Sequence, residues 1–146
     1  MRRIIRIMCM VLSVLFLVSI PVLAEESNPY SSIFFASYDS FIRNPAGNSL
    51  RIWFDVVGNG IMDEIGVQSV LLERSSDGEN WTSYRTFFPE DYPQMICEDT
   101  GIAYDYVSCA VSYGYYYRAY VTFYAKNSRG RGNAYDYAET IYLPVP

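Results

Sequence analysis

The stretch YGYYYRAYVTFYAKN, residues 113–127, alternates between two sets of side chains. Successive residues of an extended strand point to opposite faces of a sheet, so a period of two is typical of a half-buried β-strand. One set, mostly apolar, consists of Tyr117, Ala119, Val121, Phe123 and Ala125. The other, mostly polar or aromatic, consists of Tyr116, Arg118, Tyr120, Thr122, Tyr124 and Lys126. The stretch therefore predicts a strand with the first set in the core and the second on the surface.

The same alternation recurs along the rest of the chain. No window after residue 24 keeps a helical apolar rhythm for three turns, whereas short alternating segments are separated by Gly, Asn, Asp and Pro. The candidate strands lie near residues 33–43, 49–58, 66–75, 80–88, 102–111, 115–126 and 134–143. This spacing predicts an all-β fold, a single antiparallel β-sandwich of about seven strands. The predicted core is Leu50, Ile52, Phe54, Val56, Val70, Leu72, Tyr117, Ala119, Val121 and Phe123.

Two segments resemble a known sandwich family. AYVTFYAKNSRGRG, residues 119–132, is similar to the sixth strand and following hairpin of a fibronectin type III or related immunoglobulin-like domain, and VLLERSSDGENWTSYRT, residues 70–86, is similar to its third strand, turn and fourth strand. The resemblance implies the fold but no function. In that family a tryptophan of the second strand points inward, whereas here Phe54 has the inward parity and Trp53 is its neighbour.

A second resemblance spans most of the chain after residue 24. MDEIG at 62–66, ERSSDGENW at 73–81 and YRAYVTFYA at 117–125 resemble an uncharacterised family of small secreted proteins of Gram-positive, clostridia-type bacteria. The resemblance implies export and a β-sandwich. It implies no catalytic residues.

The N-terminus has the pattern of a secretory signal. Three arginines precede an apolar run from Ile7 to Ile20, and Val22-Leu23-Ala24 forms a small-residue cleavage site. The alternative is a retained membrane anchor, because the run is nearly long enough to cross a bilayer. We expect residues 1–24 to be a signal peptide and 25–146 a single domain that is secreted, without stable membrane insertion after cleavage.

Charge limits the kinds of partner. Removing residues 1–24 leaves 8 basic and 16 acidic residues, a net charge of 8 − 16 = −8. A strongly acidic chain is a poor match for phosphate backbones, so we expect no nucleic-acid partner.

The two cysteines that remain after cleavage, Cys97 and Cys109, form an even pair in an exported chain. An oxidising compartment favours a disulfide between them. The alternative is two buried thiols.

The composition argues against an enzyme. The chain has no histidine, which removes Ser-His-Asp and Cys-His nucleophile systems and the usual zinc and copper sites. The acidic pairs, Asp63-Glu64, Glu90-Asp91 and Glu98-Asp99, lie near predicted turns, where adjacent carboxylates point apart and are typical of solvated loops. We expect no catalytic residues, no metal site and no cofactor.

Binding is the remaining class of function. The candidate binding residues are Tyr116, Arg118, Tyr120 and Tyr124, on the outward face of the predicted strand. They suit a protein-interaction module at the cell surface, whose partner can also be a second copy of the chain. The alternative is a carbohydrate-binding module that stacks tyrosines on sugars. A third interpretation is purely structural, because tyrosine favours half-exposed strands.

Overall fold

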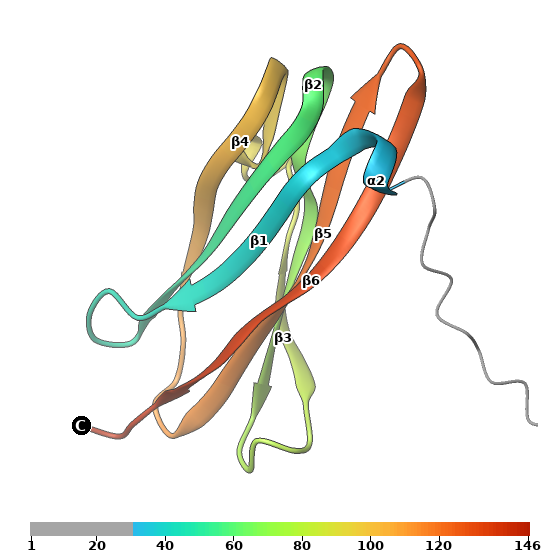
Figure 1. Ribbon diagram of the computed structural model, residues 1–146. Coiled ribbons are helices and arrows are strands. Elements are labelled where there is room, and N and C mark those ends of the chain that lie inside the picture. The colour runs from blue at the N-terminus through green and yellow to red at the C-terminus, as the bar shows by residue number, and fades with distance from the viewer. Residues whose placement is uncertain (1–30) are drawn as a thin grey trace, which may run out of the picture.

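The computed structural model describes residues 31–146, shown in Figure 1. The predicted signal peptide, residues 1–24, lies outside this range. The predicted all-β class is confirmed: the strands are β1 (Phe35–Arg43), β2 (Ser49–Ser75), β3 (Thr82–Phe87), β4 (Ile96–Ala110), β5 (Tyr115–Asn127) and β6 (Gly130–Leu143). The helical elements of this part of the chain are the short helix α2 (Ser31–Phe34), just before β1, and the 3-10 turn η1 (Pro93–Met95), between β3 and β4.

All six strands belong to one antiparallel sheet with the order β1-β2-β5-β6, and β3 and β4 also pair with β2. Strand β2 is 27 residues long and contains both the second and the third predicted strand. The first half of β2 lies between β1 and β4. The second half has β5 on one side, and on the other side it has first the start of β4 and then β3. Figure 1 shows β2 reaching one end of the molecule and returning toward the other. The expected number of about seven strands is therefore six, because β2 bends without breaking.

The bend lies where the register between β2 and β4 shifts, between Val57 and Met62. Gly60 has a φ of 113° and Gly66 a φ of 152°, values that residues with a Cβ rarely adopt. At Gly66 a Cβ would also overlap the carbonyl oxygen of Met95. Glycine at these positions lets the strand turn and lets another backbone approach it closely.

The predicted core is confirmed, since each of its ten residues is fully buried. Residues that the alternation did not single out complete it, among them Met62, Ile65, Phe87 and Met95. Tyr117 is the largest buried side chain, and its hydroxyl donates to the Ser112 carbonyl at 2.9 Å and accepts from the Ser112 amide at 3.0 Å. A buried phenol needs such partners, because an unpaired hydroxyl in a core is costly.

The sheet curls until its two outer strands meet. Figure 1 shows β1 and β6 side by side, and the hydroxyl of Ser40 on β1 donates to the carboxylate of Asp136 on β6 at 2.7 Å. Ser40 is buried at this junction. The contact joins strands that are 96 residues apart in the sequence.

The expected disulfide is wrong, because Cys97 and Cys109 are both free thiols on strand β4. Cys97 lies opposite Ile65 and Cys109 opposite Leu50. The two thiols are 12 residues apart on one strand. Twelve residues of extended strand span roughly 40 Å. A disulfide needs Cα atoms within about 7 Å.

Candidate binding surface

The residues predicted to form a binding surface lie together on one face of β5. Tyr116, Arg118, Tyr120 and Tyr124 alternate with the buried residues of this strand, as the sequence predicts, and each is half-buried. They are half-buried because side chains of β6 and β2 pack beside them. The face is therefore wider than one strand.

Strand β6 contributes three further tyrosines to this face. The β5–β6 register places Tyr142 opposite Tyr116, Tyr137 opposite Tyr120 and Tyr135 opposite Thr122. Their exposed fractions are 47% for Tyr142, 55% for Tyr137 and 52% for Tyr135, larger than those of the β5 tyrosines. We use "tyrosine face" for Tyr116, Tyr120, Tyr124, Tyr135, Tyr137 and Tyr142.

Arg118 lies at the centre of this face and has contacts on three sides. Its guanidinium carbon is 4.3 Å from the centre of the Trp81 ring and 5.1 Å from that of Tyr137. Its Nε donates to the Glu73 carboxylate at 2.8 Å. Rings and carboxylate together fix the guanidinium, since a planar cation stacks on aromatic faces while donating in its own plane. Arg118 therefore connects β2, β5, β6 and the residue before β3.

The tyrosine rings contact one another but do not lie in a common plane. Tyr120 is parallel to Tyr135, with 6° between the ring planes and 5.7 Å between centres. Tyr120 and Tyr137 are tilted by 50° at 4.7 Å, and Tyr116 and Tyr142 by 42° at 4.7 Å. The face therefore presents ring edges and hydroxyls as well as ring faces, and it is not a row of coplanar rings.

At its far end the tyrosine face is bordered by an ion pair. Lys126 Nζ donates to Glu64 Oε1 at 2.7 Å. This bond lowers the pKa of Glu64 and raises that of Lys126. Burial, followed by the Glu64 charge, raises the pKa of the Tyr124 phenol. Both cations that the sequence places on this face, Arg118 and Lys126, thus have a carboxylate partner.

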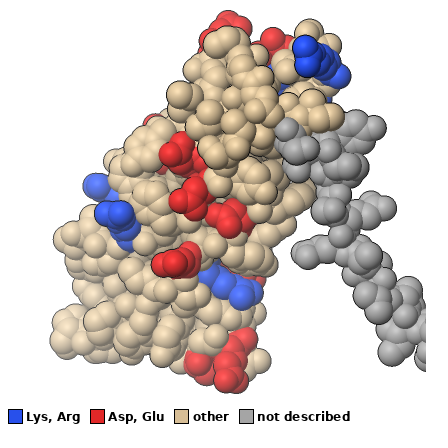
Figure 2. Space-filling view, in the orientation of Figure 1, with Lys and Arg blue, Asp and Glu red and all other residues tan. Residues whose placement is uncertain are grey.

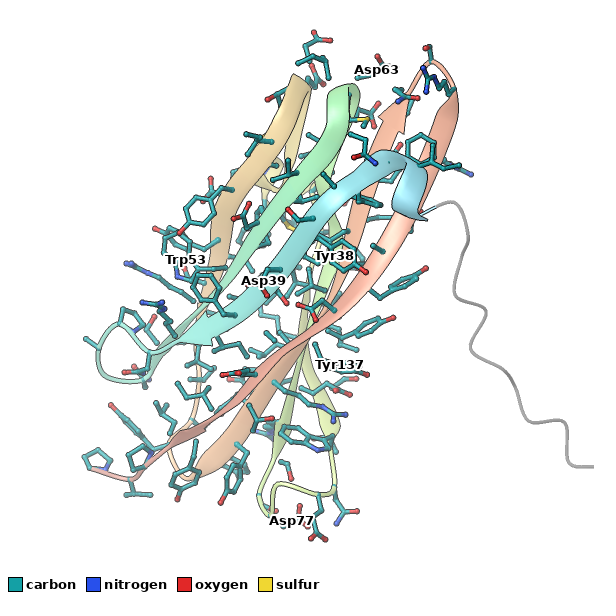
Figure 3. The ribbon with its side chains drawn as sticks, in the orientation of Figure 1. Tyr38, Asp39, Trp53, Asp63, Asp77 and Tyr137 are labelled. Atoms are coloured by element: carbon teal, nitrogen blue, oxygen red, sulfur yellow. The ribbon has the colours of Figure 1, made fainter. Side chains whose placement is uncertain are left out.

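The β2–β3 hairpin, at the foot of this face, is held by Asp77, labelled in Figure 3. Its Oδ1 accepts from the Ser75 hydroxyl at 2.7 Å and from the amides of Glu79 and Asn80 at 2.9 and 2.8 Å. Its Oδ2 accepts from the Asn80 side chain at 2.7 Å. These bonds, that of the Asn80 side chain foremost, hold the pKa of Asp77 far below its usual range. The Asp77 carboxylate thus accepts its hydrogen bonds from groups within its own turn.

The acidic pairs do not form a metal site in the part of the chain that the structure describes, where no group of three or more His, Cys, Asp or Glu side chains converges. Asp63 and Glu98 lie at the end of the molecule where β2 bends, and Glu64 is opposite Glu98 in the register. Glu64 is paired with Lys126 instead. Like Asp77 in its hairpin, Glu64 therefore has a partner within the domain.

Sequence reasoning did not find the β6 tyrosines or Trp81. The alternation in AYDYAET, residues 134–140, places Tyr135 and Tyr137 on the same face of a strand. The turn at Asn127–Gly130 implies that β5 and β6 pair as a hairpin. Together these signals place Tyr135 and Tyr137 beside Tyr120. The contacts of Arg118 with Glu73 and Trp81 had no comparable signal, because they join residues distant in sequence.

Comparisons with protein-family models, curated proteins and solved structures gave no match. Between residues 31 and 146, none of the helices has the length and apolar character needed to cross a membrane.

Proposed function

We propose that the domain is an immunoglobulin-like sandwich of the fibronectin type III kind. The strand pairing supports this, because the first half of β2 pairs with β1 and most of β4, whereas the second half pairs with β5, β3 and the start of β4, and β6 follows beside β5. The Tyr117 hydroxyl, bonded to the backbone five residues upstream, is a second supporting feature, since such domains have a tyrosine corner at the start of the corresponding strand. In this assignment the two halves of β2 belong to opposite layers.

We further propose that the protein is secreted, is not an enzyme and binds a protein partner at a cell surface through the tyrosine face. The observation that carries the proposal is the arrangement of Tyr135, Tyr137 and Tyr142, each about half exposed, around a fixed Arg118. Tyrosine and arginine are enriched in protein interfaces, and tyrosine contributes a large contact area at little entropic cost. The net charge of −8 after residue 24 matches a soluble exported domain.

The tilt of the rings favours a protein over a polysaccharide. A flat sugar chain stacks on aromatic rings that share a plane, whereas Tyr120 and Tyr137 are tilted by 50° and the face of Tyr120 toward Tyr135 is covered. Carbohydrate binding is the alternative function, and the experiment has to distinguish it from protein binding.

Site-specific photocrosslinking tests the proposal. A benzophenone amino acid replaces Tyr137 in one variant and Tyr104, 56% exposed on β4 and outside the tyrosine face, in the matched control. Each variant is incubated with surface material of the producing cells, and the same preparations are applied to a glycan array. We expect one discrete adduct with a different protein at position 137, no adduct with that protein at position 104 and no glycan signal.

Specificity is then checked with Tyr135→Ser and Tyr137→Ser together as a competitor that has no photocrosslinker. Unlike the wild type, this variant should not reduce capture of that protein at position 137, while its unfolding midpoint stays close to that of the wild type. Binding to the array that depends on the same two tyrosines would replace the protein partner with a glycan. An adduct with the same protein and of equal intensity at position 104 would refute the assignment of the face.

A further inference from the structure

A second aromatic surface lies on the outer face of β1, the first half of β2 and β4. The register there sets the outward residues in four rows across the strands. In order along the strands, the rows are Arg43, Arg51 and Ser108; Phe41, Trp53 and Tyr106; Asp39, Asp55 and Tyr104; and Ser37, Val57 and Ile102. We call this surface the Trp53 face; Figure 3 labels Trp53 and Asp39 on it.

The aromatic row is continuous across three strands. Phe41 and Trp53 are stacked at 6.1 Å between ring centres, and Trp53 is 4.6 Å from Tyr106 and 5.3 Å from Tyr104. Tyr104 is 56% exposed and Ile102 58%. Large exposed apolar groups gathered on one flat face are typical of an interaction site.

The charges of the Trp53 face are separated by sign. Arg43 lies opposite Arg51 on one side of the aromatic row, and Asp39 lies opposite Asp55 on the other. Like charges directly opposite each other destabilise a sheet. None of the four makes a salt bridge within the described part of the chain. Figure 2 shows one group of basic side chains at the left edge of the view and several acidic side chains to the right of it.

The two arginines are held in place by the aromatic row. The guanidinium of Arg43 is 4.9 Å from the centre of the Phe41 ring, and that of Arg51 is 4.8 Å from the centre of Tyr106. Stacking orients a guanidinium and leaves its N–H groups free to donate at the ring edge. The positive row is therefore prepared for carboxylates that come from outside the domain.

We propose that the Trp53 face binds a second copy of itself about a two-fold axis that runs along the aromatic row. Rotation about this axis reverses the strand direction, so that Arg43 lies over Asp39 of the other copy and Arg51 over its Asp55. The aromatic rows then pack on each other. A two-fold axis parallel to the strands would bring arginine over arginine, which the charges oppose. An isologous interface requires this self-complementarity.

The size of the face predicts a weak dimer. Rows are about 6.8 Å apart and strands about 4.8 Å, so the three rows that overlap and the three strands extend roughly 14 Å by 10 Å between Cα atoms. With side chains the contact covers on the order of 1,000 Å² over both copies, the lower limit for a specific interface. The affinity should therefore be modest and should fall with ionic strength.

Sedimentation velocity of the full chain, over a series of protein and salt concentrations, tests this proposal. Arg43→Glu with Arg51→Glu makes the face entirely acidic, and Asp39→Lys with Asp55→Lys makes it entirely basic. The matched control, Arg129→Glu with Arg131→Glu in the exposed β5–β6 hairpin, changes the net charge as much as the first variant.

We expect a salt-sensitive monomer–dimer equilibrium for the wild type and the control. Each variant of the Trp53 face alone should dimerise at least about tenfold more weakly, because like charges face each other across the interface. An equimolar mixture of the acidic and basic variants should restore a 1:1 dimer, which also shows that both variants are folded. Tyr135→Ser with Tyr137→Ser should leave the dimer intact, which separates this inference from the proposed function.

Three results would overturn the inference. The first is a wild type that stays monomeric at every concentration. The second is a dissociation constant that both charge reversals leave unchanged, and the third is a mixture of the two variants that does not associate.

Discussion

Arg118 and Glu73 are 45 residues apart in the sequence, and their side chains meet at 2.8 Å across β5 and β2. The side chain of Arg118 is 30% exposed and that of Glu73 is 16% exposed. Because the guanidinium already has a carboxylate, it contributes shape and N–H donors to the tyrosine face more than free positive charge. A partner of this face is therefore selected mainly by aromatic contact and hydrogen bonding.

Replacing Phe54 with alanine should lower the free energy of unfolding by about 3–5 kcal/mol, as full aromatic deletions in cores do. Phe54 is completely buried in β2. Val57→Ala, three residues along the strand on the Trp53 face, is the control and should cost less than about 1 kcal/mol. Denaturant titration measures both. Equal shifts would show that the inward and outward assignments of β2 are wrong.

Tyr117→Phe should cost about 1–3 kcal/mol, because it leaves the backbone amide and carbonyl of Ser112 without the phenol that bonds both. Tyr116→Phe removes a hydroxyl from the adjacent outward position and should be close to neutral. Thermal unfolding of the two variants compares them directly. A Tyr117→Phe variant as stable as Tyr116→Phe would mean that the corner hydrogen bonds have no net effect.

The protein should yield two alkylatable thiols and no linked peptide, even from material exported through an oxidising compartment. Burial is the main cause that raises the pKa of both cysteines, so both should react slowly at neutral pH. Buried Cys109 should react more slowly than half-buried Cys97. Timed alkylation followed by peptide mapping measures the rates. A Cys97–Cys109 peptide would contradict the path of β4.

Asp77→Asn should destabilise the protein at neutral pH, and the difference from the wild type should shrink as the pH falls. The pKa of Asp77 is lowered in the folded state from a usual value of 3.8, so its ionised form stabilises the fold above that value. Protonation in the unfolded chain removes this advantage as the pH decreases through about 4 toward the lower folded pKa. Urea unfolding at several pH values measures the difference. A difference that does not vary with pH would contradict the role of the carboxylate in the hairpin.

The alternation in β2 and β5 was enough to predict the all-β class and the ten core residues, because burial on one face of a strand imposes a period of two. It was not enough to show that residues 49–58 and 66–75 are one strand. Gly58, Gly60 and Gly66 are typical of a turn between two strands, and here they allow a continuous strand to bend. Local pattern does not distinguish these outcomes, because the difference depends on pairing with β4.

The same limit applies to the two surfaces. The outward parity of Tyr116, Tyr120 and Tyr124 was predictable from β5 alone, whereas the exposed tyrosines that widen the face come from β6. Cys97 and Cys109 were expected to pair because they are the two cysteines after residue 24. The sequence alone does not show how far apart they lie along β4. The rows of the Trp53 face depend on the register of β1, β2 and β4 together.

The affinity of the partner captured at Tyr137 is the most direct test of the tyrosine face as a binding surface. Its dissociation constant is measured for the wild type, for Tyr135→Ser with Tyr137→Ser, and for the Tyr104→Ser control. We predict that the double variant binds at least about tenfold more weakly while its stability stays within about 1 kcal/mol of the wild type. The control should bind like the wild type. An unchanged affinity in the double variant, with the fold intact, would contradict the account.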